Sequence, residues 1–274
     1  MLVWQDGGGL RRACDSLTEL LELAGLGDRR RISLLGSGGK TRGLYSLGFW
    51  ARAQGLRCLL GTTTHLLRPQ EAGGLAVLTE PSPPRLRALF AAGALVLSAR
   101  PRAGAKGGVN GDKLGAWSPE EQAQLQAEAE FCILEADGSA RLPLKYPDLT
   151  YEPALRDDQD AVLLFLNPSA LGTAGEASCH RWALYQAERG LSRPPGAAVE
   201  VADVLHFIGR YREAQRRLCP QALFRPVLSH AAEPGAQVGL ETLATAYQCR
   251  YGEGLIIWDL PPTPAEEPRV PAEE

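Results

Sequence analysis

The sequence predicts a three-layer α/β fold around a mostly parallel sheet. The chain has 274 residues, of which 45% are hydrophobic, so it can bury a sizeable core. Short apolar runs that are typical of buried strands alternate with segments of helical pattern, as expected when helices connect parallel strands. A glycine-rich turn joins the first of these strands to its helix, which is the third observation in favour of this fold class.

The clearest element lies between residues 32 and 41. An apolar run over residues 32–35 predicts a buried strand, and a helical pattern follows residue 41. Glycine lets backbone N–H groups turn toward a phosphate, and a helix start adds free N–H groups and partial positive charge. We therefore predict a nucleotide-binding turn in a P-loop NTPase-like fold, formed by Gly36, Ser37, Gly38, Gly39, Lys40 and Thr41.

Two side chains of this turn have predicted roles. Lys40 would bind the β- and γ-phosphates as a point charge without a role in the core, and the Thr41 hydroxyl would bind Mg²⁺. The turn is shorter than the usual P-loop, because Leu34 stands where its first glycine is expected, and it resembles the Mur-ligase form instead. The alternative is a tight strand-to-helix turn that binds nothing.

An acidic strand end supplies the second half of the predicted site. Residues 131–134 are apolar and are followed by Glu135 and Asp137, which resembles a Walker B strand. We predict that Thr41 with Glu135 or Asp137 holds Mg²⁺. Solvated acids at a strand end are the alternative.

Other polar groups follow predicted strands or lie in the connecting loops. In an open parallel sheet such positions face one crevice, so these groups are candidates for binding a second, anionic ligand. The set comprises Thr64 and His65 after the strand 56–61, Lys113 after a glycine-rich segment, Lys145 and Glu152 in a proline-rich loop, and the pair His180-Arg181. Lys40, Asp137 and His180 are the candidates for catalysis, although a structural histidine remains the alternative at residue 180.

The remaining elements complete the frame. We expect further strands at 75–78, 94–97, 161–166, 225–228 and 254–260, and helices at 198–208 and 236–247. Ser118 followed by a proline and two glutamates predicts another helix start. Residues 1–27 are expected to form a covering helix, residues 28–260 the α/β domain, and residues 261–274 a flexible tail rich in Pro and Glu.

Composition excludes several classes of function. The formal net charge of −3 gives no sign of nucleic-acid binding. No apolar stretch reaches the ~18 residues that a membrane span requires. The six cysteines show no paired spacing, so we expect buried, reduced thiols in a cytoplasmic protein.

Several motifs together carry a resemblance to a known family. The succession GSGGKT, TTTH, DKLG, EADGSARLPLKYP and CHRW, between residues 32 and 182, resembles the YqeC family. That resemblance implies an accessory protein for selenium-dependent molybdenum hydroxylases that binds nucleotide and Mg²⁺, with the residues above lining the site. No N-K-x-D motif for guanine follows the strand at 225–228, so ATP is the favoured nucleotide. The charge of His65, Lys145, His180 and Arg181 suits an anionic second ligand: a phosphate, a selenophosphate or a phosphorylated pterin cofactor. The resemblance also implies that the hydroxylase is the protein partner.

Three functions remain open at this point. The first is an ATP-dependent factor, either an Mg²⁺-dependent ATPase or a transferase, that matures the selenium-containing molybdenum cofactor. The second is a Mur-like ligase that forms an acyl-phosphate, although only about 80 residues follow Leu191 for the domain such ligases need. The third is a nucleotide-dependent scaffold without turnover.

Overall fold

The chain folds into two compact units. The computed structural model describes residues 1–101, 113–138, 140, 142–230 and 236–260. Unit 1 contains Met1–Lys40 and Glu135–Leu260, and unit 2 contains Thr41–Leu134. The predicted tail at 261–274 lies outside the described residues, as does most of the glycine-rich segment before Lys113.

Unit 1 holds most of the regular structure. Its elements are β1 (Leu2–Gln5), β2 (Arg11–Ala13), α1 (Leu17–Leu23), β3 (Arg31–Gly36), β11 (Leu144–Lys145), β12 (Ala161–Leu166), the 3-10 helix η1 (Pro168–Ala170), α5 (Gly175–Ser178), β13 (Cys179–His180), α6 (Trp182–Arg189), α7 (Val201–Leu218), β14 (Leu223–Ser229), α8 (Ala236–Tyr251) and β15 (Leu255–Trp258).

The strands of unit 1 run in the order β2-β1-β15-β14-β12-β3. The neighbours from β15 to β3 are parallel, and β1 and β2 add an antiparallel hairpin at the far edge. Because β3, β12 and β14 are parallel, their carboxyl ends meet at one edge of the sheet. A separate pair of short parallel strands, β11 and β13, places Lys145 opposite His180.

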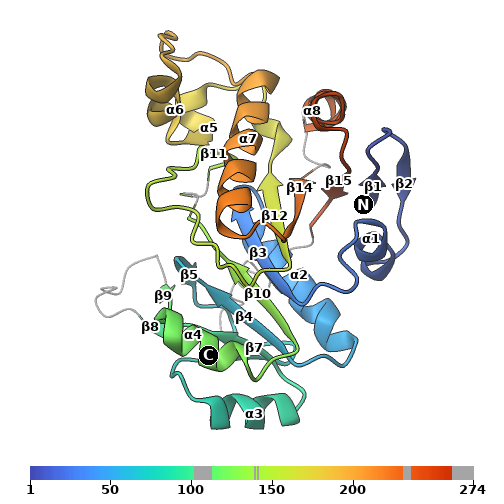
Figure 1. Cartoon of the computed structure of the whole chain (residues 1–274), viewed down its shortest axis with the longest axis vertical. Helices are drawn as coiled ribbons and strands as arrows, with labels where there is room; N and C mark the ends of the chain where they lie inside the picture. The colour runs from blue at the N-terminus through green and yellow to red at the C-terminus, as the bar shows by residue number, and fades with distance from the viewer. Residues whose placement is uncertain (102–112, 139, 141, 231–235, 261–274) are drawn as a thin grey trace, which may run out of the picture. The chain divides into compact units, whose positions relative to one another are not determined.

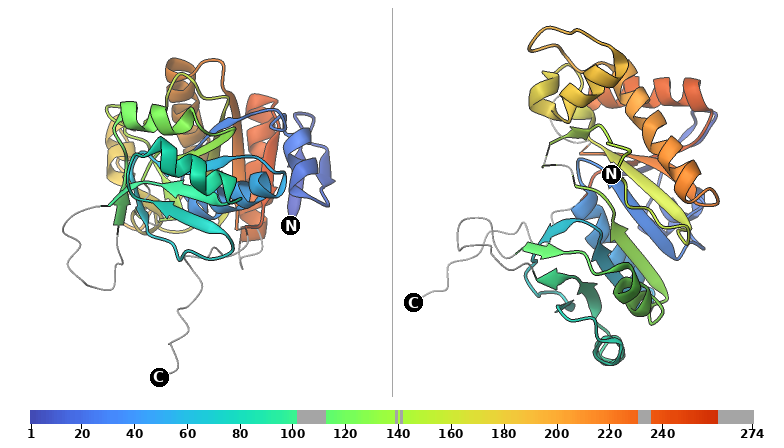
Figure 2. Two further views of the ribbon diagram at one scale, coloured as in Figure 1. Left: turned by 90° about the horizontal axis from the view of Figure 1, so that it is seen from below. Right: turned by 60° about the vertical axis from the view of Figure 1, so that its left-hand side comes forward.

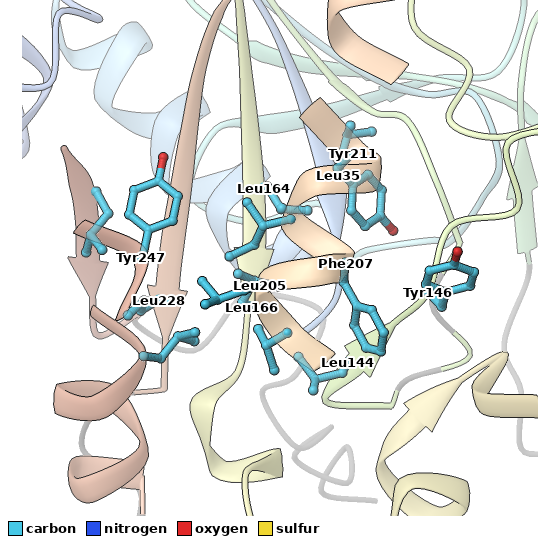
Figure 3. Packing of buried hydrophobic residues seen from close by; sticks show 14 of the residues in the cluster. Leu35, Leu144, Tyr146, Leu164, Leu166, Leu205, Phe207, Tyr211, Leu228 and Tyr247 are labelled. Atoms are coloured by element: carbon cyan, nitrogen blue, oxygen red, sulfur yellow. The ribbon is translucent and has the colours of Figure 1, made fainter. Parts of the chain in front are cut away.

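A layer of helices covers one face of the unit 1 sheet. Alternate residues of β12, namely Val162, Leu164 and Leu166, belong to the same buried cluster as side chains of α7 and α8. Figures 1 and 2 show α7 lying over β12 and β14 in different views. Figure 3 shows how Leu164 and Leu166 of the sheet face Phe207 and Leu205 of α7.

Unit 2 is also α/β. It contains the rest of α2 (Lys40–Ala53), then β4 (Cys58–Thr62), β5 (His65–Leu67), β6 (Leu75–Leu78), α3 (Pro83–Ala91), β7 (Leu95–Ser98), β8 (Arg100–Pro101), β9 (Lys113–Gly115), α4 (Pro119–Gln126) and β10 (Phe131–Glu135), whose last residue belongs to unit 1.

The strands of unit 2 form two sheets. Strands β10, β4, β7 and β6 lie in this order, with β7 parallel to both β4 and β6. Strands β5, β9 and β8 form a small antiparallel sheet. Leu59, Leu86, Phe90 and Leu125 are among the side chains of the buried cluster of this unit.

The predicted fold class is confirmed. The structure is α/β, and its main strands are mostly parallel and flanked by helices, as in a three-layer NTPase-like domain. The strands predicted at 75–78 and 161–166 have those bounds, and Ser118 opens α4 with a complete capping box. The helix expected at 198–208 begins at Val201 and continues to Leu218.

The structure adds elements that the sequence analysis did not expect. Residues 2–13 form β1 and β2 ahead of the expected helix, because Trp4 pairs with Ile256 at the other end of the chain. Five of the six cysteines are buried as free thiols, but Cys249 on α8 is exposed, which corrects the expectation that all are buried. None of the helices in the described ranges is long and apolar enough to cross a membrane.

We predict that Leu164→Ala lowers the free energy of unfolding by about 2–5 kcal/mol, because it leaves a cavity where β12 meets α7. Leu164 is fully buried, whereas Leu10 is 73% exposed in the β1–β2 hairpin. Leu10→Ala is therefore the matched control and should change stability by less than about 0.5 kcal/mol. Urea unfolding of both variants provides the measurement, and equal small losses would contradict the described core.

Candidate phosphate-binding site

The turn between β3 and α2 requires glycine. Strand β3 ends at Gly36 and helix α2 begins at Lys40. Gly36 and Gly38 have φ angles of 84° and 79°, which L side chains rarely adopt. A Cβ atom at Gly38 would in addition lie 2.6 Å from Cβ of Asn167. The GSGG sequence is therefore what allows the chain to turn this tightly beside β12.

Residues at neighbouring strand ends hold the turn in place. The Ser37 N–H donates to the carbonyl of Phe165 at 2.9 Å, and the Ser37 hydroxyl donates to the carbonyl of Leu142. The Ser229 hydroxyl at the end of β14 donates to the carbonyl of Gly38. The turn thus has a fixed shape that depends on the carboxyl ends of β12 and β14.

The tip of the turn retains unused hydrogen-bond donors. The backbone N–H groups of Gly38, Gly39 and Lys40 have no acceptor within the part of the chain that the structure describes. Gly38 and Gly39 are half-buried, so they are not sealed from solvent. The Lys40 ammonium folds back over the turn and donates to the carbonyl of Gly36 at 2.5 Å. In other proteins, backbone N–H groups and a lysine at a helix start commonly bind phosphate, so this turn is a candidate site.

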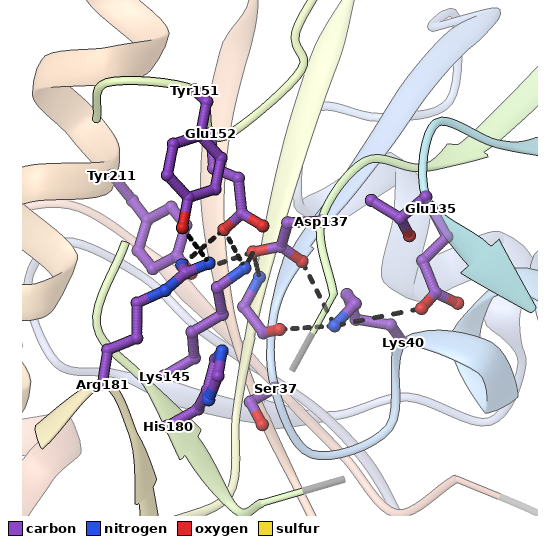
Figure 4. Close-up of polar contacts among 12 residues, drawn as sticks. Ser37, Lys40, Glu135, Asp137, Lys145, Tyr151, Glu152, His180, Arg181 and Tyr211 are labelled. Carbon is purple, nitrogen blue, oxygen red and sulfur yellow. Dashed lines mark hydrogen bonds and ion pairs between the residues drawn. The ribbon is translucent and has the colours of Figure 1, made fainter. Parts of the chain in front are cut away.

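Asp137 lies at the centre of the site and is fully buried. Its Oδ2 accepts hydrogen bonds from the Gly36 N–H at 3.0 Å and from the Tyr211 hydroxyl at 2.9 Å. The ammonium groups of Lys40 and Lys145 lie 3.2 Å from Oδ1 and Oδ2 respectively. Figure 4 shows these groups converging on one carboxylate. Within the described residues, Oδ1 accepts no hydrogen bond, and the Lys40 ammonium faces it as an ion-pair partner.

Ion pairs continue on both sides of Asp137. On one side, Lys40 lies 4.0 Å from Glu135. On the other, Lys145 also pairs with Glu152, and the Arg181 guanidinium donates to Glu152 at 2.6 Å (Figure 4). The six charges alternate in sign and sum to zero, in the order Glu135, Lys40, Asp137, Lys145, Glu152 and Arg181. We call these six residues the charge network.

Arg181 ends the charge network in a strained conformation. Its φ of 65° is a left-handed conformation that side chains other than glycine rarely adopt. Its guanidinium also donates to the Tyr151 hydroxyl at 2.9 Å and lies 5.2 Å from the centre of that ring. Burial disfavours its charge, but the hydrogen bond and charge of Glu152 outweigh this and raise the pKa of Arg181. The contacts of the side chain with Glu152 and Tyr151 help to offset this backbone strain.

Burial and neighbouring charge shift two further groups. Burial, followed by the positive charges of Arg181 and Lys145, lowers the pKa of His180. Burial, followed by the charge of Asp137, raises the pKa of Tyr211 well above its ordinary value. Near neutral pH the Tyr211 hydroxyl is thus a neutral hydrogen-bond donor, and His180 favours its neutral form.

Unit 1 brings together many of the predicted site residues. The turn from Gly36 to Lys40 lies with Glu135, Asp137, Lys145, Glu152 and Arg181, and His180 is opposite Lys145 in the β11–β13 pair. Lys40 is 3% exposed and ion-paired, which differs from the expectation that it has no role in the core.

The other predicted site residues belong to unit 2. Thr41 is the second residue of α2, and the Thr64 N–H donates to the Thr62 hydroxyl at 3.0 Å. His65 and Lys113 begin the paired strands β5 and β9, and both are exposed. That these four residues form one site with the charge network stays a prediction.

Sequence reasoning missed two members of the site. Tyr211 lies on α7, 74 residues from Asp137, and no motif marks it. Tyr151 precedes the predicted Glu152 and is 63% exposed, so only its contact with Arg181 identifies it. Ser229 did carry a signal, because it stands at the end of a predicted strand.

Comparison with known proteins assigns the family. The protein family described as YqeC protein matches residues 32–183, which is more than half of the chain. The chain belongs to the YqeC family. The matched range contains the glycine turn and all six residues of the charge network. A relative described as uncharacterized protein YqeC, from Escherichia coli (strain K12), is 26% identical over 234 residues, covering 76% of this chain and 88% of the relative.

We predict that this YqeC chain loses stability as the pH falls below about 6.5. His180 binds a proton less readily in the folded protein than in the unfolded chain, since burial lowers its folded-state pKa. Between the two pKa values the unfolded chain therefore holds more protons, and the free energy of unfolding rises with pH. Urea unfolding between about pH 7.5 and pH 5 should show that the free energy of unfolding falls less for His180→Gln than for the wild type.

His206 serves as the internal reference for this experiment. Its pKa is also lowered by burial, and its ring stacks on Tyr146 in the core. The His180→Gln variant should therefore keep the part of the pH dependence that comes from His206. Identical pH slopes for the variant and the wild type would contradict the described environment of His180.

Proposed function

We propose that this YqeC protein binds ATP with Mg²⁺ on the turn formed by residues 36–41 and hydrolyses it. The observation that carries the proposal is the turn itself, where the N–H groups of Gly38, Gly39 and Lys40 have no acceptor among the described residues and lie beside a lysine ammonium. Backbone N–H groups and a lysine at a helix start are the standard means of holding the phosphates of a nucleotide. No motif for guanine selection follows the late strand β14, which favours ATP over GTP.

The donor set also suits magnesium. Mg²⁺ is usually held by one or two carboxylates together with phosphate oxygens and water, rather than by a complete protein cage. The described residues contain no group of three or more His, Cys, Asp or Glu side chains that could hold a metal ion. Oδ1 of Asp137 accepts no hydrogen bond among the described residues, so it is the carboxylate oxygen that could take a new partner once Lys40 turns to a phosphate. Thr41 and Glu135 are the other candidates.

Within that site, the chain's own residues would have distinct roles. Gly38, Gly39 and Lys40 would bind and orient the phosphates, and bound Mg²⁺ would supply charge stabilisation during phosphoryl transfer. Asp137 would keep the turn in shape through the Gly36 N–H. His180, half-buried and favouring its neutral form, is the candidate for moving a proton at the edge of the charge network.

We further propose that this chemistry serves maturation of the selenium-containing molybdenum cofactor of selenium-dependent hydroxylases in the cytoplasm. This part rests on the motifs shared with the YqeC family. The second ligand would be selenophosphate or a pterin cofactor, and the hydroxylase would be the partner. Of the two unit 1 cations proposed to bind this ligand, Lys145 has no exposed side chain, whereas Arg181 has a relative exposure of 16%.

We predict that Lys40→Met weakens ATP binding by roughly ten- to a hundredfold, because a charge-assisted contact with the phosphates is lost. Since Lys40 is buried and ion-paired, the variant should also melt at a lower temperature. Arg193→Met is the matched control, because Arg193 likewise pairs with a buried carboxylate, Asp203, outside the turn. Calorimetric titration below the melting temperature of each variant gives the affinities, and an unchanged affinity in Lys40→Met would remove the proposal.

We predict that Asp137→Asn and Glu135→Gln differ in their effect on magnesium. Replacing the residue that binds Mg²⁺ should abolish most of the gain in ATP affinity that magnesium provides. Replacing the other should leave that gain in place. Titrations with ATP in Mg²⁺ and in EDTA provide the comparison. If both variants keep the full magnesium effect, neither carboxylate is a ligand.

A further inference from the structure

The Lys145 side chain has no exposed surface and lies between two carboxylates. Its ammonium is 3.2 Å from Oδ2 of Asp137, and it also contacts Oε2 of Glu152. A side chain in this position cannot reach a ligand unless both ion pairs break. Its role must therefore be sought in what it does to Asp137 rather than in direct contact with a substrate.

Asp137 is a buried carboxylate shared by two lysines. Lys40 faces Oδ1, and Lys145 faces Oδ2. The other two partners of Asp137, the Gly36 N–H and the Tyr211 hydroxyl, are neutral donors. When a phosphate binds the turn and attracts Lys40, one positive charge leaves the carboxylate. A buried charge without a counter-ion is strongly destabilising, so Lys145 must then balance Asp137 alone.

We propose that Lys145 is a positioning residue that neutralises Asp137 and thereby releases Lys40 to bind phosphate. The inference rests on the proposed nucleotide binding by the turn. Without the charge of Lys145, Asp137 would hold Lys40 more tightly, and any phosphate would have to compete against that ion pair. Lys145 thus strengthens phosphate binding without contacting the phosphate.

Glu152 and Arg181 adjust this effect from the other side. Glu152 competes with Asp137 for Lys145, and Arg181 engages Oε2 of Glu152 at 2.6 Å. Without the charge of Glu152, Lys145 would pair more strongly with Asp137. The ion pair between Asp137 and Lys40 would then be weaker, and Lys40 would be freer to bind phosphate. Without Arg181, Glu152 would pair more strongly with Lys145 and weaken the pairing of Lys145 with Asp137. The two substitutions should therefore change phosphate affinity in opposite directions.

The test is a double-mutant cycle, with ATP titrated in EDTA so that metal binding does not contribute. Lys145→Met should weaken ATP binding by about fivefold or more, the lower end of typical coupling between sites. In the Asp137→Asn background, where Lys40 has no buried anion to hold it through Oδ1, the further change Lys145→Met should have no effect. The full-length chain is used throughout.

Asp203 provides a control that matches Asp137 closely. It is 1% exposed and is held by the Arg193 guanidinium, the Tyr185 hydroxyl and the Glu200 N–H. Asp203→Asn and Arg193→Met should lower the melting temperature, as loss of a buried ion pair does, yet leave ATP affinity unchanged. A general effect of destabilisation is thereby separated from an effect on Lys40.

Each outcome decides the question. Unchanged affinity in Lys145→Met, or an equal loss in the Asp137→Asn background, would overturn the inference while leaving nucleotide binding intact. A wild-type chain that binds no ATP would instead refute the proposed function itself. If Lys145→Met does not fold, Glu152→Gln decides the matter. A twofold or larger gain in its affinity would support the inference, and an unchanged or weaker affinity would overturn it.

Discussion

The buried carboxylate of Asp137 is the interaction on which the candidate site depends. It joins the first residue of the glycine turn, a lysine at the start of α2, a lysine on β11 and a tyrosine on α7. These groups come from segments far apart in the chain, so one side chain fixes their relative positions within unit 1. Because the carboxylate is fully buried, its charge is stabilised by these partners rather than by water.

The neutrality of the charge network has a consequence for binding. A turn with free lysine charge would attract any anion, whereas here each cation already faces a carboxylate. A ligand must therefore offer Lys40 a better partner than Asp137 does. A polyphosphate together with a metal ion meets this condition, since it both attracts the lysine and supplies a new cation. Under the proposed function, the arrangement would favour nucleotide polyphosphates over single anions such as chloride or sulfate.

Features that depend on residues close together in the sequence could be predicted from it. Glycines at positive φ, an apolar run with defined limits and a capping box act within a few residues, so the turn, β6, β12 and the start of α4 were predictable. Burial of a charged side chain depends on distant partners. Gly36 and Asp137 are 101 residues apart, and Lys145 looked like a ligand residue because no local pattern shows that it is enclosed. The strands of residues 2–13 escaped prediction for the same reason, as their pairing partner lies near residue 256.

A crystal structure with Mg²⁺ and an ATP analogue that cannot be hydrolysed would test the central claim most directly. We expect the triphosphate to lie on the N–H groups of Gly38, Gly39 and Lys40. We also expect the Lys40 ammonium on the phosphates and Lys145 still beside Asp137. A nucleotide bound elsewhere, or a bound nucleotide with Lys40 still on Asp137, would contradict that claim.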